Sequence, residues 1–90
     1  MRILWDEPKR RTTLVKPGLD FADLGPTFFE SAVVLRVRQE RFQAIGPLSR
    51  RLIAVVFLPL GTEAISVISM RYANRKEREI YEAEDPAPHG

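Results

Sequence analysis

The segment LIAVVFL at residues 52–58 constrains the fold most, because apolar side chains fill both of its faces and several are β-branched. A strand of this kind is buried on both sides, so the pattern predicts a central strand of a sheet. Pro59 and Gly61 then predict a turn into another strand over residues 64–70. The chain is therefore expected to build its core around a sheet.

A strand-to-helix junction follows directly. Simple alternation along the strand predicted at residues 64–70 places Arg71, which follows this strand, on the same face as Ile65. Asn74 and Glu77 have the spacing of a capping box, which predicts the start of a C-terminal helix. The junction would hold an arginine at a nearly fixed position beside a helix N-terminus.

The first third of the chain predicts two short N-terminal helices. Asp6 is a plausible N-cap for a helix that runs to about residue 16. A second short helix is expected over residues 20–30, interrupted at Gly25. Residues 1–5 form either a short edge strand or an extended lead-in.

Two further strands complete the expected fold. Alternation over residues 33–38 and 41–46 predicts an antiparallel pair that joins the two strands described above. The fold class is therefore α+β, with two short N-terminal helices, a four-stranded, mainly antiparallel sheet and a C-terminal helix, and with helices over one face. We expect a single domain over residues 1–84 and a frayed, proline-rich tail over residues 85–90.

Composition excludes several classes of function. The 90 residues contain no cysteine, and His89 in the tail is the single histidine. A disulfide framework, a metal centre or a catalytic triad is therefore not expected, and neither is a cofactor. No apolar run approaches the length of a membrane span and no signal peptide is apparent, so we expect a cytoplasmic protein without a membrane partner.

The charge is small but unevenly distributed. The formal net charge is +2, yet basic residues gather in segments 1–18 and 36–58 and acidic residues in segment 19–35. Such a surface suits phosphate on one side. The acidic stretch from Asp20 to Glu30 is a candidate docking surface for a basic partner, with an ordinary solvated helix face as the alternative.

Basic side chains are the main candidate functional residues. Arginine grips phosphate with two parallel hydrogen bonds. RNA supplies its own nucleophile, the 2′-hydroxyl, so its cleavage needs positioning and charge stabilisation but no metal. The candidates near strands are Arg36, Arg38, Arg41, Arg50, Arg51 and Arg71, and those at the start of the last helix are Arg75 and Lys76. For each of them a structural or solvating role is the alternative.

Aromatic side chains offer a second way of binding RNA. Trp5, Tyr72 and Tyr81 are available to stack on unpaired bases. A place in the core is the alternative, and for Trp5 we favour it.

Five segments, taken together and in order, resemble the motifs of the BrnT-type toxins. They are WDEPKR at 5–10, KPGLDFA at 16–22, ERFQAIG at 40–46, ISVISMRYA at 65–73 and KEREIYE at 76–82. The resemblance implies a toxin of a type II toxin–antitoxin system with a RelE-like fold. It further implies an endoribonuclease that cuts cellular RNA and thereby inhibits translation. The implied partner is a BrnA-like antitoxin, through which alone the toxin would reach operator DNA.

The resemblance also assigns residues. Arg71 matches the arginine that ends the family's Ile-Ser-x-Arg strand, Arg41 matches that of its Glu-Arg-Phe strand, and Lys16 matches the lysine of its Lys-His-Gly motif. We therefore expect Arg71 and Arg41 to be catalytic, assisted by Lys16 and Tyr81, with substrate binding by Arg36, Arg38, Arg75 and Lys76.

This chain departs from the family pattern at two places. Pro17 stands where the family often has histidine, which removes one proton carrier. The segment between residues 32 and 40 is shorter than usual. Two other functions therefore stay open, a nucleic-acid-binding module without catalysis and an inactive toxin homologue that acts in an antitoxin complex.

Overall fold

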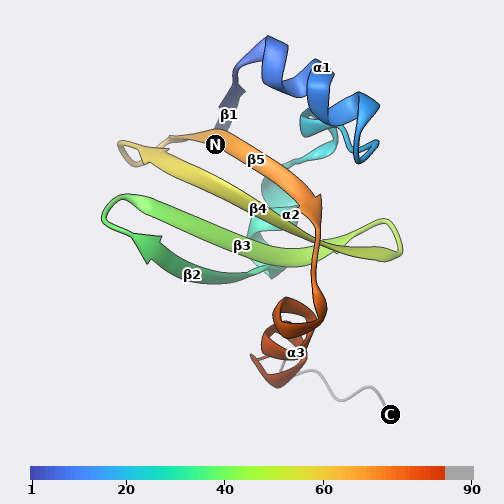
Figure 1. Cartoon of the computed structure of the whole chain (residues 1–90). Helices are drawn as coiled ribbons and strands as arrows, with labels where there is room; N and C mark the ends of the chain where they lie inside the picture. Colours follow the sequence, from blue (N-terminus) through green and yellow to red (C-terminus); the bar gives the residue numbers. More distant parts are fainter. Residues whose placement is uncertain (85–90) are drawn as a thin grey trace.

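The computed structural model describes residues 1–84, which form a curved sheet flanked by short helices (Figure 1). The predicted tail, 85–90, lies outside these described residues. None of the helices within residues 1–84 is long and apolar enough to cross a membrane. The elements in chain order are β1 (Arg2–Trp5), α1 (Glu7–Val15), the 3₁₀ turn η1 (Phe21–Asp23), α2 (Pro26–Ser31), β2 (Val33–Arg38), β3 (Arg41–Leu48), β4 (Arg51–Leu60), β5 (Ala64–Tyr72) and α3 (Arg75–Glu84).

The sheet has five strands in the order β1-β5-β4-β3-β2. The α+β class and the C-terminal helix are confirmed, but the prediction of four strands is wrong. The additional strand is β1, which pairs in parallel with β5 from Arg2 opposite Ala64 to Trp5 opposite Val67. The sequence left residues 1–5 open between a short edge strand and an extended lead-in, and β1 is the edge strand. Its partner is some sixty residues away in the chain, so short alternation alone could not decide between the two.

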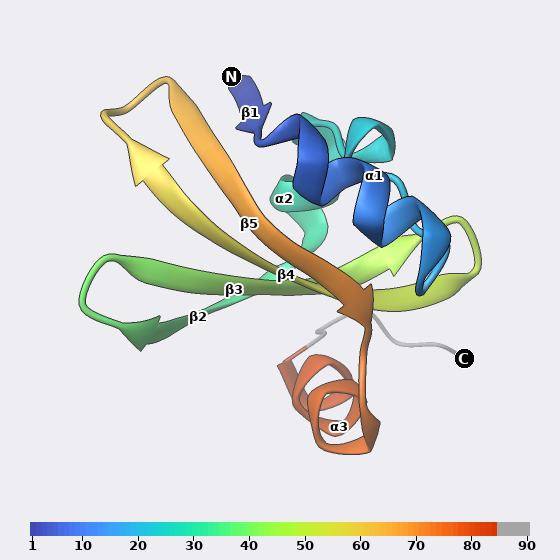
Figure 2. The ribbon, with the colours of Figure 1, turned by 45° about the horizontal axis from the view of Figure 1, so that its top comes forward.

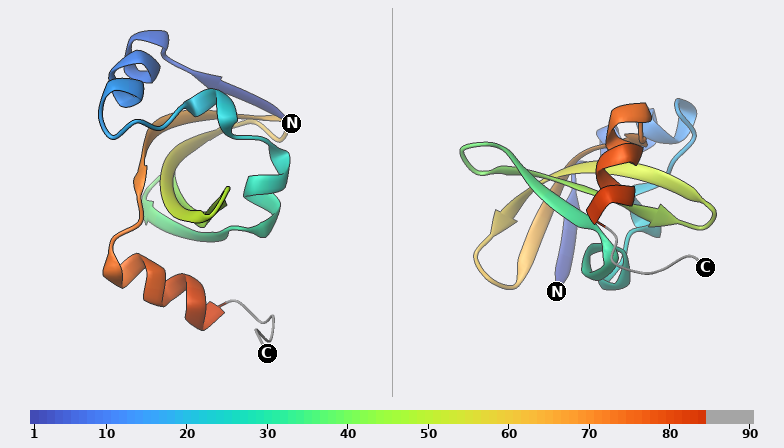
Figure 3. Two further views of the ribbon diagram at one scale, coloured as in Figure 1. Left: turned by 90° about the vertical axis from the view of Figure 1, so that its right-hand side faces the viewer. Right: turned by 90° about the horizontal axis from the view of Figure 1, so that it is seen from below.

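The helices differ in arrangement from the prediction. The first helix is found as expected, with the Asp6 side chain accepting a hydrogen bond from the Lys9 N–H. The expected second helix is two elements, η1 and α2, separated at Gly25. Figure 3 shows that α3 lies outside the curve of the sheet, away from α1 and α2, so the helices do not all cover one face.

The core fills the space between the sheet and the segment that holds η1 and α2. Phe21 is fully buried, and Phe28 is 5% exposed. The sheet contributes a layer of apolar side chains from β3, β4 and β5, namely Ala44, Ile53, Val55, Phe57, Ile65, Val67 and Met70. The prediction of a central strand is confirmed, because β4 lies in the middle of the sheet and Val55 is completely buried.

A β-bulge in β5 changes which face its last residues occupy. Val67 lies opposite Phe57, but Ser69 lies opposite Val56, so Ile68 is an extra residue in the ladder. An extra residue reverses the alternation that follows it. Met70 therefore joins Val67 in the core, and Arg71 points to the opposite face, where α3 lies. The predicted shared face of Arg71 and Ile65 is wrong for this reason.

Candidate functional site

Arg71 lies at the end of β5 and forms a bidentate ion pair with Glu77 of α3. Its Nη1 donates to Glu77 Oε1 and its Nη2 donates to Glu77 Oε2, both at 2.7 Å. Parallel bonds of this kind are among the strongest pairings of side chains. The position of the guanidinium is therefore set by α3 as well as by β5.

Glu77 is held in turn by its surroundings. Its carboxylate also accepts hydrogen bonds from the Asn74 N–H at 2.9 Å and from Gln43 Nε2 at 2.8 Å. The Asn74 side chain accepts one from the Glu77 N–H at 2.8 Å, which confirms the predicted capping box. Glu77 is only 8% exposed, and the Arg71 guanidinium is the largest of the influences that lower its pKa to about 2. The carboxylate stays charged at any physiological pH.

Part of the Arg71 guanidinium remains available to a ligand. Besides Glu77, its Nη1 donates to the Tyr72 carbonyl oxygen at 3.3 Å. A guanidinium has five N–H donors. Within residues 1–84, the Nε–H and the second Nη2–H have no hydrogen-bond partner, and the side chain is 49% exposed. These two donors lie along one edge of the planar group, which suits the two oxygens of a phosphate.

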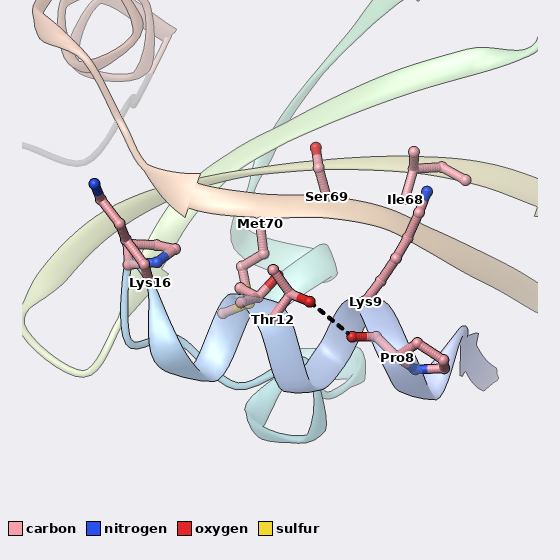
Figure 4. A pocket seen from close by; sticks show the side chains of 9 residues that line it. Pro8, Lys9, Thr12, Lys16, Ile68, Ser69 and Met70 are labelled. Carbon is pink, nitrogen blue, oxygen red and sulfur yellow. Dashed lines mark hydrogen bonds between the residues drawn. The ribbon is translucent and has the colours of Figure 1, made fainter.

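A groove between α1 and β5 leads towards the same end of β5. It has a volume of about 340 Å³, and its lining residues are Pro8, Lys9, Thr12, Thr13, Lys16, Pro17, Ile68, Ser69 and Met70. Figures 2 and 4 show α1 lying along β5, with Lys9 and Lys16 at the two ends of the groove. The structure thus brings the predicted Lys16 beside the strand that carries Arg71, and adds Lys9.

The predicted residue Arg41 lies at another place on the sheet. Ile45 of β3 pairs with Ala54, which pairs with Arg71, and Arg41 is four residues before Ile45. At about 3.3 Å per residue and about 4.8 Å between strands, the Cα atoms of Arg41 and Arg71 are on the order of 16 Å apart. The two arginines share a face but not a contact.

Arg36 and Arg38 lie with Arg41 at the hairpin that joins β2 to β3. The Arg36 Nε donates to the Gln39 carbonyl oxygen at 2.8 Å, and its guanidinium lies 6.0 Å from the centre of the Phe42 ring. Arg38 pairs directly with Arg41 across the strands, and both are exposed. The hairpin is therefore a second basic surface, separate from the end of β5.

Three further candidates lie on α3, whereas the guanidinium of the candidate Arg51 lies 4.3 Å from the centre of the Tyr72 ring. Arg75 and Lys76 are exposed at its first turn, and Arg75 pairs with Glu79 at 3.5 Å. Tyr81 is half-buried one turn after Glu77, so it lies on the side of the helix that faces the sheet. Lys76 thus lies one residue before Glu77 and Tyr81 one turn after it, and within residues 1–84 neither side chain is hydrogen-bonded to Arg71.

Other predicted features have structural partners. Asp20, in the acidic stretch, accepts hydrogen bonds from Arg10 at 2.7 and 3.2 Å. That pairing lowers the pKa of Asp20 and removes one of the three carboxylates from the expected docking surface. Trp5 is half-buried against the core, and its Nε1–H donates to Glu7. Within residues 1–84, no group of three or more potential ligand side chains is arranged to hold a metal ion.

Sequence reasoning missed three residues of this region. Glu77 was recognised as a capping residue but not as the partner of Arg71. Gln43 gives no local signal, because it lies 34 residues from Glu77 in the chain. Lys9 had one signal that was available, its spacing of seven residues from Lys16, which places both on one side of a helix.

Comparisons with known proteins agree on one family. Residues 5–77 match the family model described as the ribonuclease toxin BrnT of type II toxin–antitoxin systems. The crystal structure of the ribonuclease toxin BrnT from Brucella abortus is similar with a TM-score of 0.78 and 54% sequence identity, over 83% of this chain and 99% of that chain. A comparison with curated protein sequences gave no match. The chain therefore belongs to the BrnT family of ribonuclease toxins of type II toxin–antitoxin systems.

Proposed function

We propose that this toxin cleaves RNA without a metal, and that Arg71 holds the scissile phosphate. The observation that carries the proposal is the bidentate ion pair between Arg71 and the buried Glu77. This pairing fixes the guanidinium while its Nε–H and one Nη2–H stay free within the described residues. A preorganised donor pair of this kind stabilises charge that develops on phosphate oxygens.

The reaction needs no nucleophile from the protein. The 2′-oxygen of the substrate attacks the phosphorus as its proton leaves, and the bond from phosphorus to the 5′-oxygen breaks as that oxygen gains a proton. The products are a 2′,3′-cyclic phosphate and a 5′-hydroxyl. Arg71 stabilises the negative charge on the non-bridging oxygens, and Lys16 and Tyr81 assist from the two sides of β5.

Basic residues further from Arg71 bind the flanking RNA. Arg75 and Lys76 are exposed beside the pair, where the positive N-terminus of α3 adds to their charge. Arg41 lies on the same face of the sheet as Arg71, so it contacts the same RNA only if the RNA runs across that face. Arg36 and Arg38 lie at the β2–β3 hairpin, where RNA on this path would leave the sheet. We retain Arg41 as a catalytic candidate that acts across a bound substrate.

Replacement of Arg71 tests the proposal. Arg71→Ala should lower RNA cleavage by on the order of 10²- to 10³-fold, the loss typical of a removed preorganised donor. Cleavage is measured in cells after induced expression, by primer extension on cellular RNA. Arg11→Ala is the matched control, because Arg11 is an arginine of α1 whose side chain is 75% exposed and does not line the groove. Equal cleavage by the Arg71 variant would refute the assignment.

A second variant separates catalysis from folding. Arg71→Lys keeps a positive charge for Glu77 but lacks the planar fork, so it should fold and still cleave poorly. Purified protein should keep its activity in EDTA, and a requirement for added divalent metal would contradict the mechanism.

A nucleic-acid-binding module without catalysis is the second candidate, because the charge of Arg71 is already balanced by Glu77. It predicts salt-dependent RNA binding with no cleavage products from the unmodified chain. An inactive homologue that acts in an antitoxin complex predicts neither.

Membership of the family supports a proposal for the partner and the place of action. A type II toxin has a protein antitoxin, and we propose that this one is BrnA-like and that operator DNA is bound only through the complex of the two. We further propose that the toxin acts on cellular RNA in the cytoplasm. Co-purification of the chain with a basic, DNA-binding protein encoded by a neighbouring gene tests the proposed antitoxin partner.

A further inference from the structure

The α1–β5 groove has the chemistry of a phosphate-binding track. Two of its nine lining residues are lysines and none is a carboxylate. Within residues 1–84, no ion pair involves Lys9 or Lys16. Both lysines are exposed, so their ammonium groups are available to an anion.

Lys9 lies in the first turn of α1, and Lys16 is the extended residue that follows the last residue of α1. At a rise of about 1.5 Å per residue, the two lysines are about 10 Å apart along the helix axis. Figure 4 shows Lys9 and Lys16 near the two ends of α1 with Thr12 between them, while the Ser69 hydroxyl of β5 points away from α1. The positive charges therefore border the groove at both ends rather than at one point.

The helix that carries the lysines is firmly anchored at its first turns. Glu7 accepts hydrogen bonds from Trp5 and Arg10, and Arg10 also donates to Asp20 at 2.7 Å. These contacts tie α1 to β1 before it and to η1 after it. Lys9 thus starts from a fixed backbone position, which reduces the entropy lost when it binds.

The groove ends one residue before the proposed catalytic arginine, whose side chain turns to Glu77 of α3. Ser69 and Met70 line it, and Arg71 is the next residue of β5. We propose that single-stranded RNA lies in this groove, with neighbouring phosphates on Lys9 and Lys16, and that Lys9 is a substrate-binding residue. The inference rests on the proposed function, in that RNA is the substrate whose scissile phosphate Arg71 holds.

The size and lining of the groove favour one strand of RNA over a duplex. A volume of about 340 Å³ lies at the low end of small-ligand pockets, which is too small for a double helix. The prolines and Ile68 add apolar surface, on which the exposed faces of unpaired nucleotides can pack. The lysines meet the phosphates, which carry no sequence information.

Salt-dependent binding tests the role of Lys9 apart from catalysis. The probe is a 2′-O-methyl RNA oligonucleotide, which has the phosphates but lacks the nucleophile. For single strands each neutralised phosphate contributes about 0.7 to the slope of log affinity against log salt concentration. Lys9→Gln should therefore make the slope less steep by about 0.7, and the double variant Lys9→Gln/Lys16→Gln should make it less steep by about 1.4.

Arg11→Gln provides the matched control. Arg11 lies on the same helix, is 75% exposed on its side chain and does not line the groove. The control should leave the slope unchanged. On cleavable RNA, Lys9→Gln should raise KM several-fold with little change in kcat, whereas Arg71→Ala should lower kcat.

The outcomes separate this inference from the proposed function. Equal slopes for Lys9→Gln and Arg11→Gln would overturn the groove assignment while leaving cleavage at Arg71 intact. If Lys9→Gln made the slope less steep by about 0.7 but the unmodified protein cleaved no RNA, the assignment of the groove would be supported and the proposed catalysis would be refuted. If Lys9→Gln weakened only the complex with an antitoxin, the groove would belong to the protein partner and the inference would fail.

Discussion

Replacement of Glu77 by glutamine should destabilise the protein in a pH-dependent way. The perturbation removes the charge that pairs with Arg71 but keeps the size of the side chain and one carbonyl acceptor. Gln43 and the Asn74 N–H also bond to this carboxylate, so its loss affects β3, β5 and α3 together.

The magnitude follows from the pKa of Glu77, which is about 2 rather than 4.5. Each pH unit between those values is worth about 1.4 kcal/mol, so ionised Glu77 contributes at most about 3.5 kcal/mol to the free energy of unfolding at pH 7. The Arg71 side chain is 49% exposed, and water weakens its attraction. We therefore expect Glu77→Gln to lower the free energy of unfolding by about 2 kcal/mol at pH 7.

The sign of the pH dependence is determined by the lowered pKa. A carboxylate with a lowered pKa in the folded state stabilises that state above its unfolded pKa, here near 4.5. The contribution is lost as the pH falls from about 4.5 towards about 2. The difference between the unmodified chain and Glu77→Gln should thus be constant above pH 6 and less than half as large at pH 3.

Urea denaturation at pH 7, 4 and 3 measures this difference, and carboxylates common to both proteins largely cancel. Glu79→Gln is the control, because Glu79 lies on the same helix, is 63% exposed on its side chain and pairs with Arg75 at 3.5 Å. Its effect should stay within about 0.5 kcal/mol. A loss for Glu77→Gln below about 0.5 kcal/mol at pH 7, or one that is equal at pH 7 and pH 3, would refute the reasoning.

Two further substitutions test how the rest of the fold holds the site. A Cβ atom at Gly46 would lie 3.1 Å from the Ala32 Cβ, so Gly46→Ala should lower the free energy of unfolding by about 1–2 kcal/mol, and an unchanged urea midpoint would contradict this packing. Asp20→Asn removes the charge that Arg10 pairs with, so it should lower the melting temperature at pH 7 more than Asp23→Asn does, because Asp23 is exposed. Equal melting temperatures would mean that the Arg10 contacts do not anchor α1.

Local signals in the sequence predicted the elements that depend on neighbours in the chain. The apolar segment 52–58 identified the central strand, and the Asn74–Glu77 spacing identified the start of α3. Asp6 gave the start of α1 in the same way. Each of these signals involves residues within one turn of helix or along one strand, so no knowledge of the tertiary fold was needed.

Features that join distant segments were not predictable in this way. The parallel pairing of β1 with β5 joins the first strand of the chain to the last, and the weak alternation of residues 1–5 could not decide between an edge strand and an extended lead-in. The contact of Gln43 with Glu77 depends on how α3 crosses the sheet. Family resemblance assigned a role to Arg71, but it did not reveal the carboxylate that holds it.

The bulge at Ile68 explains why the candidate site exists at all. Without the extra residue, alternation would carry Arg71 to the face of Val67 and the apolar core, and would turn Met70 towards α3. A buried, unpaired guanidinium would be costly there. The bulge instead sends Met70 into the core and turns Arg71 outward to Glu77. It also lies beside the groove, since Ile68 and Ser69 form part of its lining. One inserted residue thus places the phosphate-binding arginine on the surface and next to the proposed path of the RNA, a combination that strict strand periodicity could not produce.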